Sequence, residues 1–281
     1  MPAPLRSPSI NIDRRTGCAL ASPHTGRVWI LLAVCSLATA LPPALPERGF
    51  SFGLTGGLGT VRDDLLAPLR WNLGLLQPTA AYAATARRLK HEAQVALSVG
   101  YGANRYGHDA ALLALRAECG LAPARGVALA GGNLWPGGFA FYRCHNAYLF
   151  SWDDSHLYWM NGFGIGPSAE WRGRVAGRVN AVASLQFALF ALAARPAAER
   201  RHKIEPINQL GFYFVDNWRR LRPCLPHQYT AAEVAIGLGW HSRRSLMAAG
   251  YAFDLLHVPW PAAATSLTHG LWLRWSAGAA Q

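Results

Sequence analysis

The clearest pattern in the chain is an alternation of hydrophobic residues with small or polar ones near the C-terminus. On both sides of the polar segment Ser242–Ser245, every second residue is hydrophobic: Ala232, Val234, Ile236, Leu238 and Trp240, then Met247, Ala249, Tyr251, Phe253 and Leu255. Because side chains of a strand point alternately to opposite faces, this pattern predicts a β-hairpin with one hydrophobic face. The other face is small and polar, which is the reverse of a soluble sheet and typical of a barrel whose outside contacts lipid.

The same alternation recurs along most of the chain and predicts ten strands. They are expected at residues 49–61, 72–87, 93–101, 110–120, 127–150, 157–171, 174–191, 232–241, 246–255 and 265–276. The fifth is expected to carry bulges at Gly131-Gly132 and at Pro136-Gly137-Gly138. Short turns near residues 89, 123, 172 and 243 alternate with longer connections near 66, 106, 153, 210 and 260. The predicted fold class is therefore all-β, an antiparallel up-and-down transmembrane β-barrel with its short turns in the periplasm.

Composition agrees with a membrane barrel. Charged residues make up 15% of the chain, against about 25% in an ordinary soluble protein. No segment after residue 50 has 18 consecutive apolar residues, and the longest candidate, residues 181–194, is interrupted by Ser184 and Gln186. A membrane protein without spanning helices must be a closed barrel, because only these two forms satisfy the backbone in lipid.

The first 40 residues are predicted to be a signal peptide with a long N-terminal extension. The apolar run 28–40 follows Arg27 and ends in Ala38-Thr39-Ala40, a small-x-small cleavage pattern. The alternatives are a retained N-terminal anchor and a lipoprotein signal ending at Cys35. The remaining predicted parts are a Pro-rich linker over 41–48, the barrel domain over 49–276 and a tail over 277–281.

The net charge points to lipid headgroups rather than to nucleic acid. Cleavage after Ala40 removes four Arg and one Asp, a net of +3, and reduces the formal charge from +12 to +9. Lys occurs only at Lys90 and Lys203, and no basic run is interleaved with aromatic residues. We therefore expect contact with anionic outer-membrane lipid, including lipopolysaccharide, and no nucleic acid.

Three cysteines remain after export: Cys119, Cys144 and Cys224. An odd number cannot form a complete disulfide framework. The sequence leaves two alternatives open, a single Cys144–Cys224 bridge or three separate thiols.

Charged residues on the inward row of the predicted strands are expected to form a network in the lumen. They are Arg116, Glu118, Arg178, Glu233, Asp254 and Arg274. A ten-stranded barrel is only somewhat wider than the eight-stranded kind that side chains can fill. Unpaired charges there would be costly, so we expect ion pairs that plug the lumen. The alternative is a narrow, charge-lined channel.

Together these features resemble the bacterial outer-membrane β-barrel proteins. The resemblance covers residues 49–276 and is one of pattern rather than of a unique motif. Members of this group often end on an aromatic residue that the assembly machinery reads, whereas here Ser276–Gln281 follow Trp275. The resemblance implies an outer-membrane location, insertion by the barrel-assembly machinery and a monomeric state.

Two loop clusters have the composition of a hydrolytic site. One contains Asp153, Asp154, Ser155 and His156, and the other Arg105, Tyr106, His108 and Asp109. Omptin-type surface proteases resemble this arrangement, since they are ten-stranded and use paired Asp with an Asp–His couple at the rim. The chain lacks a convincing copy of their motifs, so no roles are transferred. Asp-Asp-Ser is also ordinary turn chemistry.

Other chemistry finds little support in the sequence. Barrel lipid esterases use a His-x-Ser arrangement, and the adjacent His241-Ser242 lacks that spacing. No Cys/His spacing suits zinc and no Gly-rich loop precedes a helix, so no metal or cofactor is predicted. Three functions remain as hypotheses: a barrel with a structural or surface-binding role and a plugged lumen, a surface hydrolase (omptin-like or lipid-acting) around Asp153, Asp154 and His156, and a channel for small solutes.

Overall fold

The computed structural model describes residues 48–64, 67–86, 88–149, 156–195, 220–241 and 245–277. The predicted signal peptide (1–40) and almost all of the predicted linker lie outside the described residues. So do residues 278–281 of the tail and most of the long connection between 195 and 227.

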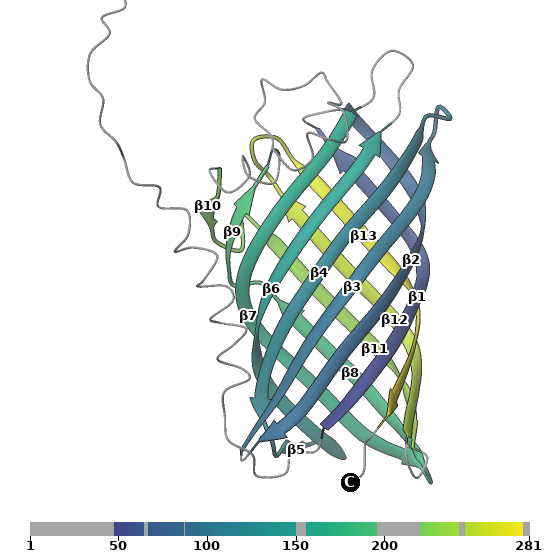
Figure 1. The fold of residues 1–281 in the computed structure, drawn as a ribbon, viewed down its shortest axis with the longest axis vertical. Helices are drawn as coiled ribbons and strands as arrows, with labels where there is room; N and C mark the ends of the chain where they lie inside the picture. Colours follow the sequence, from purple (N-terminus) through teal and green to yellow (C-terminus); the bar gives the residue numbers. More distant parts are fainter. Residues whose placement is uncertain are drawn as a thin grey trace, which may run out of the picture. The chain divides into compact units, whose positions relative to one another are not determined.

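The strands form one closed antiparallel barrel (Figure 1). Their bounds are β1 (Arg48–Asp63), β2 (Ala67–Ala86), β3 (Leu89–Asn104), β4 (Asp109–Pro123), β5 (Val127–Leu129), β6 (Gly132–Leu149), β7 (His156–Ala176), β8 (Val179–Phe187), β9 (Phe190–Ala194), β10 (Arg222–Cys224), β11 (Thr230–His241), β12 (Ser245–Val258) and β13 (Ala264–Ala277). Both β8 and β9 pair with β7, so together they form a single wall strand that is interrupted between them. Likewise, β10 pairs with β9 and β11 with β8. The short strand β5 pairs with β6 alone. When β8 and β9 are counted as one wall strand, and β10 and β11 as another, the wall has ten strands, as predicted.

Pairing between the first and last strands closes the barrel. The register of β1 on β13 runs without a break from Phe50↔Ala277 to Asp63↔Ala264. Each other wall strand is hydrogen-bonded to its neighbours in the order of the chain. The wall therefore has no free edge along most of its length, which is the condition for a sheet to stand in lipid.

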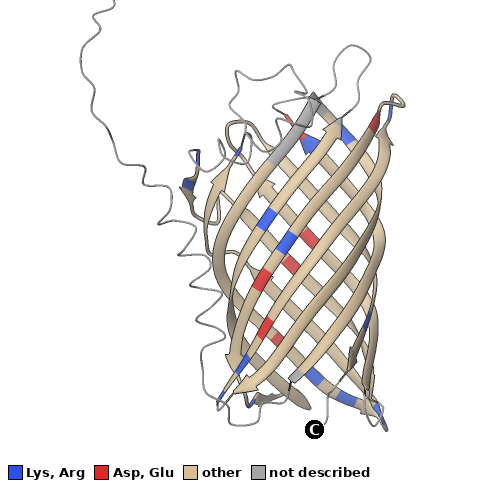
Figure 2. Ribbon diagram, viewed as in Figure 1, with Lys and Arg blue, Asp and Glu red and all other residues tan. Residues whose placement is uncertain are grey.

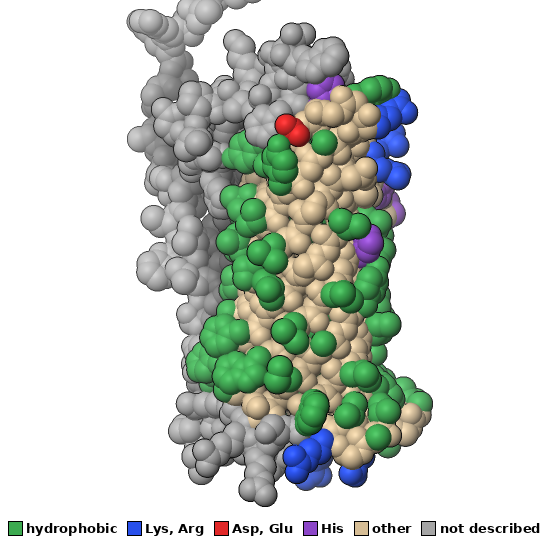
Figure 3. Space-filling model, turned by 90° about the vertical axis from the view of Figure 1, so that its right-hand side faces the viewer, with side chains coloured by type: hydrophobic (Ala, Val, Ile, Leu, Met, Phe, Trp, Pro, Cys, Tyr) green, Lys and Arg blue, Asp and Glu red, His purple; other side chains and the backbone are tan. Residues whose placement is uncertain are grey.

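The outward face is hydrophobic, as the alternation predicts. Leu271 is 72% exposed, and Leu58, Ile236 and Val95 are also exposed on the outside of the wall. Figure 3 shows hydrophobic side chains spread over the wall between basic side chains near its two ends. The inverted polarity is thus confirmed for both strands of the C-terminal hairpin, where Ile236 and Leu238 of β11 and Met247 and Tyr251 of β12 are exposed.

Among the residues that the structure describes, no helix is long and apolar enough to cross a membrane.

Several predicted boundaries are wrong. The turn expected near residue 172 lies at Gly177-Arg178, where Gly177 has a φ of 49° that favours glycine. The expected fifth strand is divided at Ala130-Gly131, so that residues 127–129 fold back on β6 instead of forming a bulge in one strand. The expected loop over 62–71 is mostly strand, because Arg62 pairs with Arg70. For the cysteines, the sequence leaves a bridge or separate thiols open, and the structure has the second alternative, because Cys144 and Cys224 form no disulfide bond.

The lipid-facing assignment predicts a depth-dependent cost for an outward charge. Leu271 lies in the middle of β13, so Leu271→Arg should lower the free energy of unfolding in lipid vesicles by about 2–4 kcal/mol. Leu121, also outward but close to the end of β4, is the matched control. Leu121→Arg should cost about 0–1 kcal/mol. Equal costs at the two positions in a urea titration would contradict the assignment.

Candidate functional site

The half of the lumen nearest the longer loops is filled by an apolar core. Inward positions at the loop ends of the strands carry large hydrophobic side chains, and these are almost completely buried. The core includes Val61, Trp71, Leu73, Leu112, Phe139, Phe141, Met160, Tyr229, Leu256 and Val258. The inward row is therefore not polar throughout, and a layer of side chains closes this half of the barrel.

Tyr229 completes this layer from outside the regular strands. The chain turns between β10 and β11, where the amides of Gln228 and Tyr229 donate to the carbonyl of Leu225 at 2.8 and 2.9 Å. The turn places the Tyr229 ring in the lumen, stacked on Phe141 with ring centroids 6.0 Å apart. A Cβ at Gly162 would lie 2.6 Å from the Tyr229 hydroxyl, so the close approach of this ring to β7 requires glycine there.

Arg195 fastens the loop end of the barrel. Its Nη2 lies 2.8 Å from Oδ1 of Asp63 on β1, and both side chains are fully buried. Its Nη1 donates to the carbonyls of Val258, Trp260 and Ala262 at 3.3, 2.7 and 2.6 Å. One guanidinium thus joins the end of β9 to β1 and to the connection between β12 and β13.

A cluster of five charges, the central network, lies next to the apolar core. Arg116 and Arg143 are directly opposite each other on β4 and β6, and Glu233 and Asp254 are directly opposite on β11 and β12. Like charges in such positions destabilise a sheet. Here the two walls compensate each other across the lumen, because Arg116 pairs with Glu233 and Arg143 Nη1 lies 2.8 Å from Asp254 Oδ1. Glu118 adds a third carboxylate, 3.5 Å from Arg116 and 3.6 Å from Arg143.

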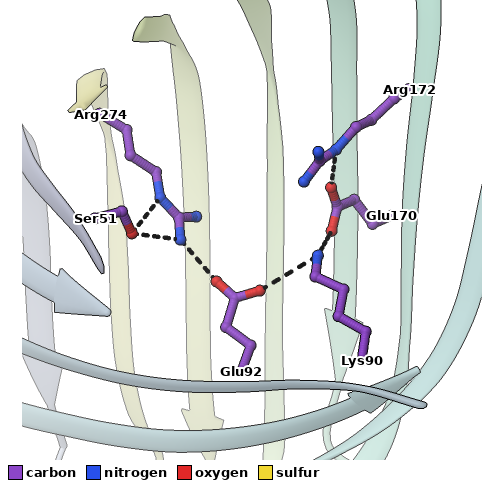
Figure 4. Close-up of polar contacts among 6 residues, drawn as sticks. All are labelled: Ser51, Lys90, Glu92, Glu170, Arg172 and Arg274. Atoms are coloured by element: carbon purple, nitrogen blue, oxygen red, sulfur yellow. Dashed lines mark hydrogen bonds and ion pairs between the residues drawn. The ribbon is translucent and has the colours of Figure 1, made fainter. Parts of the chain in front are cut away.

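A second set of ion pairs, the lower chain, crosses the lumen towards the short-turn end. Figure 4 shows it running from Ser51 through Arg274, Glu92, Lys90 and Glu170 to Arg172. Arg274 Nη2 lies 2.8 Å from the Ser51 hydroxyl and 2.7 Å from Glu92 Oε1. Lys90 Nζ lies 3.0 Å from Glu170 Oε2 and 3.7 Å from Glu92 Oε2, and Arg172 pairs with Glu170. The pairs connect strands on opposite sides of the barrel.

A cavity of about 480 Å³ occupies the lumen on the short-turn side of the apolar core. Its lining includes members of both ion-pair sets, with Gln77, Gln94 and Ser184 between them. Solvent reaches the lower chain, where the side chains of Arg172 and Arg274 are 36% and 38% exposed, whereas Arg143 is 3% exposed. The lumen is therefore a polar vestibule that ends at the central network and the apolar core. Figure 2 marks charged residues in the middle of the strands as well as near both ends of the barrel.

The structure brings five of the six predicted lumen charges inside the barrel: Arg116, Glu118, Glu233, Asp254 and Arg274. Arg178 is the exception. It lies exposed in the turn between β7 and β8, because that turn comes five residues later than predicted.

Sequence reasoning missed Arg143, Lys90, Glu92, Glu170 and Arg172. All five occupy inward positions in the alternating pattern of their strands, so extending that pattern to the strand ends could have identified them. The inward position of Arg143 is hard to recognise in the sequence, because Gly and Pro residues interrupt the alternation over 127–150. The Asp63–Arg195 pair left no local signal, since its members lie 132 residues apart.

The candidate catalytic residues are only partly described. Asp153 and Asp154 lie outside the described residues, and His156 begins β7 without a described side chain. His108 and Asp109 end the turn between β3 and β4, where Asn104 Oδ1 accepts hydrogen bonds from the amides of Tyr106 and His108. This is ordinary Asx-turn chemistry. Within the described part of the chain, no group of His, Cys, Asp and Glu could hold a metal ion.

Comparison with solved structures gives the same architecture. The outer-membrane protease OmpT of Escherichia coli is similar over 85% of this chain and 99% of its own, with 7% identity and a TM-score of 0.50. The fold is that of a bacterial outer-membrane β-barrel. The translocator domain of the autotransporter NalP of Neisseria meningitidis matches over 90% of this chain and 95% of its own, with 11% identity and a TM-score of 0.43. No protein-family profile and no curated protein sequence matches the chain.

The exterior of this outer-membrane barrel gives its location. A continuous wall with exposed leucine, valine and isoleucine side chains would not be stable in water but suits the hydrocarbon of a bilayer. The protein accordingly resides in the bacterial outer membrane.

The central network predicts a large cost for removing its most buried cation. Arg143→Met removes the cation paired with Asp254 and leaves Arg116 as the one cation of the central network beside Glu118, Glu233 and Asp254, so the free energy of unfolding should fall by about 3–5 kcal/mol. The matched control is Arg172→Met in the more exposed lower chain, which should cost about 1 kcal/mol or less. Both values come from denaturant titrations in lipid vesicles, and a cost at Arg143 no larger than at Arg172 would contradict the network's role.

Proposed function

We propose that this outer-membrane barrel is a non-conducting protein with a structural or surface-binding role, and that its lumen is permanently plugged. The observation that carries the proposal is the double closure of the lumen. An apolar core around Trp71, Leu73 and Tyr229 fills the loop half, and the central network lies directly next to it. A solute that crossed would have to displace both.

The geometry favours this function over a channel for small solutes. The cavity lies on the short-turn side of the apolar core and does not include Trp71, Met160 or Val258 in its lining. These core side chains are at most 3% exposed. The vestibule therefore gives solutes access to the interior from one end only, and a surface-binding role belongs to the outside or the loops.

Planar-bilayer recording tests the closed lumen. The unaltered protein should give no conductance steps after insertion, because no continuous water path passes the apolar core. A variant that removes a large side chain from the apolar core and one from the central network, Tyr229→Gly with Arg143→Gly, should give conductance steps. This variant is the control that shows that the protein inserts into the bilayer in the assay. Steps of the same size from the unaltered protein would establish the channel instead.

The surface hydrolase is the second candidate. It is supported by the acids and imidazoles in the loops at one end of the barrel and by the shared fold with a protease, which by itself shows no activity. The test is peptide and lipid hydrolysis by the protein and by a triple variant, Asp153→Asn, Asp154→Asn and His156→Ala. We expect no turnover by either. Turnover that disappears in the triple variant, but persists in a control with Ser245→Ala, would replace the structural proposal with the hydrolase.

A further inference from the structure

A row of polar and basic side chains crosses the outside of the barrel near its loop end. Arg70 on β2 is paired directly with Arg62 on β1. Arg62 is in turn paired with Thr265 on β13, and Thr265 with His257 on β12. All four occupy outward positions, so four neighbouring strands present them at one level. We call these four residues the basic row.

Two arginines, Arg62 and Arg70, face each other in this row, as Arg116 and Arg143 do in the lumen. On the outside, no opposite wall of the barrel supplies carboxylates to balance them. Arg62 Nε lies 2.6 Å from Asp64 Oδ1, and the Arg62 side chain remains 49% exposed. Arg70 is exposed and forms no ion pair or hydrogen bond with the described part of the chain. In the lumen, the paired Arg116 and Arg143 are balanced by carboxylates across the barrel. The outer pair has only Asp64, so an anion from outside the protein would complete it.

Basic character extends beyond the row, and the acids nearby do not cancel it. Asn104 is paired with Trp71, which places the exposed Arg105 next to Arg70 at the end of β2 and β3. The guanidinium of Arg105 lies over the Tyr106 ring, 4.5 Å from its centroid. Among the described residues at the loop ends of β1 to β4, Asp109 is the other acid that is not buried. His257 Nδ1 and the Thr265 hydroxyl share a hydrogen bond of 2.9 Å.

Further from the loop end, four to six residues along three of these strands, the outside of the wall is hydrophobic. Leu58 on β1, Leu76 on β2 and Leu271 on β13 are all exposed there, between 51% and 72%. Figure 3 shows this combination, with basic side chains near the upper end of the wall and hydrophobic side chains beneath them. A soluble anion would use only the row, whereas a lipid with an anionic head would use both surfaces.

We propose that the basic row binds a phosphorylated glycolipid of the outer leaflet, with a phosphate between Arg62 and Arg70 and the acyl chains along Leu58, Leu76 and Leu271. The longer connections of a barrel face the outside of the cell, and the leaflet on that side contains the phosphorylated sugar headgroups of lipopolysaccharide. Arginine forms two parallel hydrogen bonds with a phosphate, which suits two guanidinium groups that face each other. This inference depends on the outer-membrane location and is independent of whether the lumen conducts.

The test is native mass spectrometry of the full chain in uncharged detergent, titrated with bisphosphorylated lipid A. The double variant Arg62→Gln, Arg70→Gln should bind lipid A roughly thirtyfold more weakly than the unaltered protein, from the usual contribution of two basic residues near an anionic surface. Lipid A from which both phosphates have been removed should bind the unaltered protein as weakly as lipid A binds the double variant. Both substituted residues are exposed, so the double variant should retain the heat-dependent gel mobility of a folded barrel.

The control variant is Arg125→Gln, Arg178→Gln, which removes two exposed arginines from the short-turn end. It should bind lipid A as the unaltered protein does, and Arg62→Lys, Arg70→Lys should recover part of the lost affinity. Phosphatidylglycerol, a phosphate lipid of the inner leaflet type, should compete poorly. Equal binding by the double and control variants, undiminished binding of the dephosphorylated lipid, or preferential binding of phosphatidylglycerol would each overturn the proposal.

Discussion

Closure of the sheet is the constraint on which the rest of this structure depends. In hydrocarbon no water can satisfy a free N–H or C=O group, so the first and last strands must pair along their whole length. The unbroken register of β1 on β13 meets this requirement. Closure also encloses an interior, and the interior of ten strands must then be filled or hydrated. The arrangement of the lumen follows from that second requirement.

The protein fills its interior in two physically different ways. At the loop end, large apolar side chains pack as they do in a soluble core, with Tyr229 inserted from a turn. At the next level, like-charged pairs on facing walls compensate each other. Buried ion pairs are weak evidence for net stability, because desolvation offsets much of the attraction. Their main effect here is on specificity. A shift of β11 by one residue relative to β12 would turn Glu233 outward and leave Arg116 without its partner.

The sequence predicts the fold more completely than the interior. Alternation with period 2 is a local property, so the ten strands, their lipid-facing row and the closed architecture could be inferred from residues such as Val234, Ile236 and Leu238. Turn positions are less strongly encoded: the alternation predicts Arg178 in the lumen, whereas Gly177 and Arg178 form the turn between β7 and β8. The partners of charged residues could not be inferred, because Arg116 and Glu233 meet only through the curvature of the whole wall. Arg195 reaches Asp63 and three backbone carbonyls for the same reason.

The cavity on one side of the apolar core makes the interior electrically asymmetric along the barrel axis. Water in the vestibule screens the lower chain, while Trp71, Leu73 and Met160 form a slab of low dielectric constant above it. Any potential across the membrane would consequently fall mostly across that slab, which is much thinner than the bilayer. The guanidinium of Arg143 stands beside it and would experience a field stronger than the average membrane field.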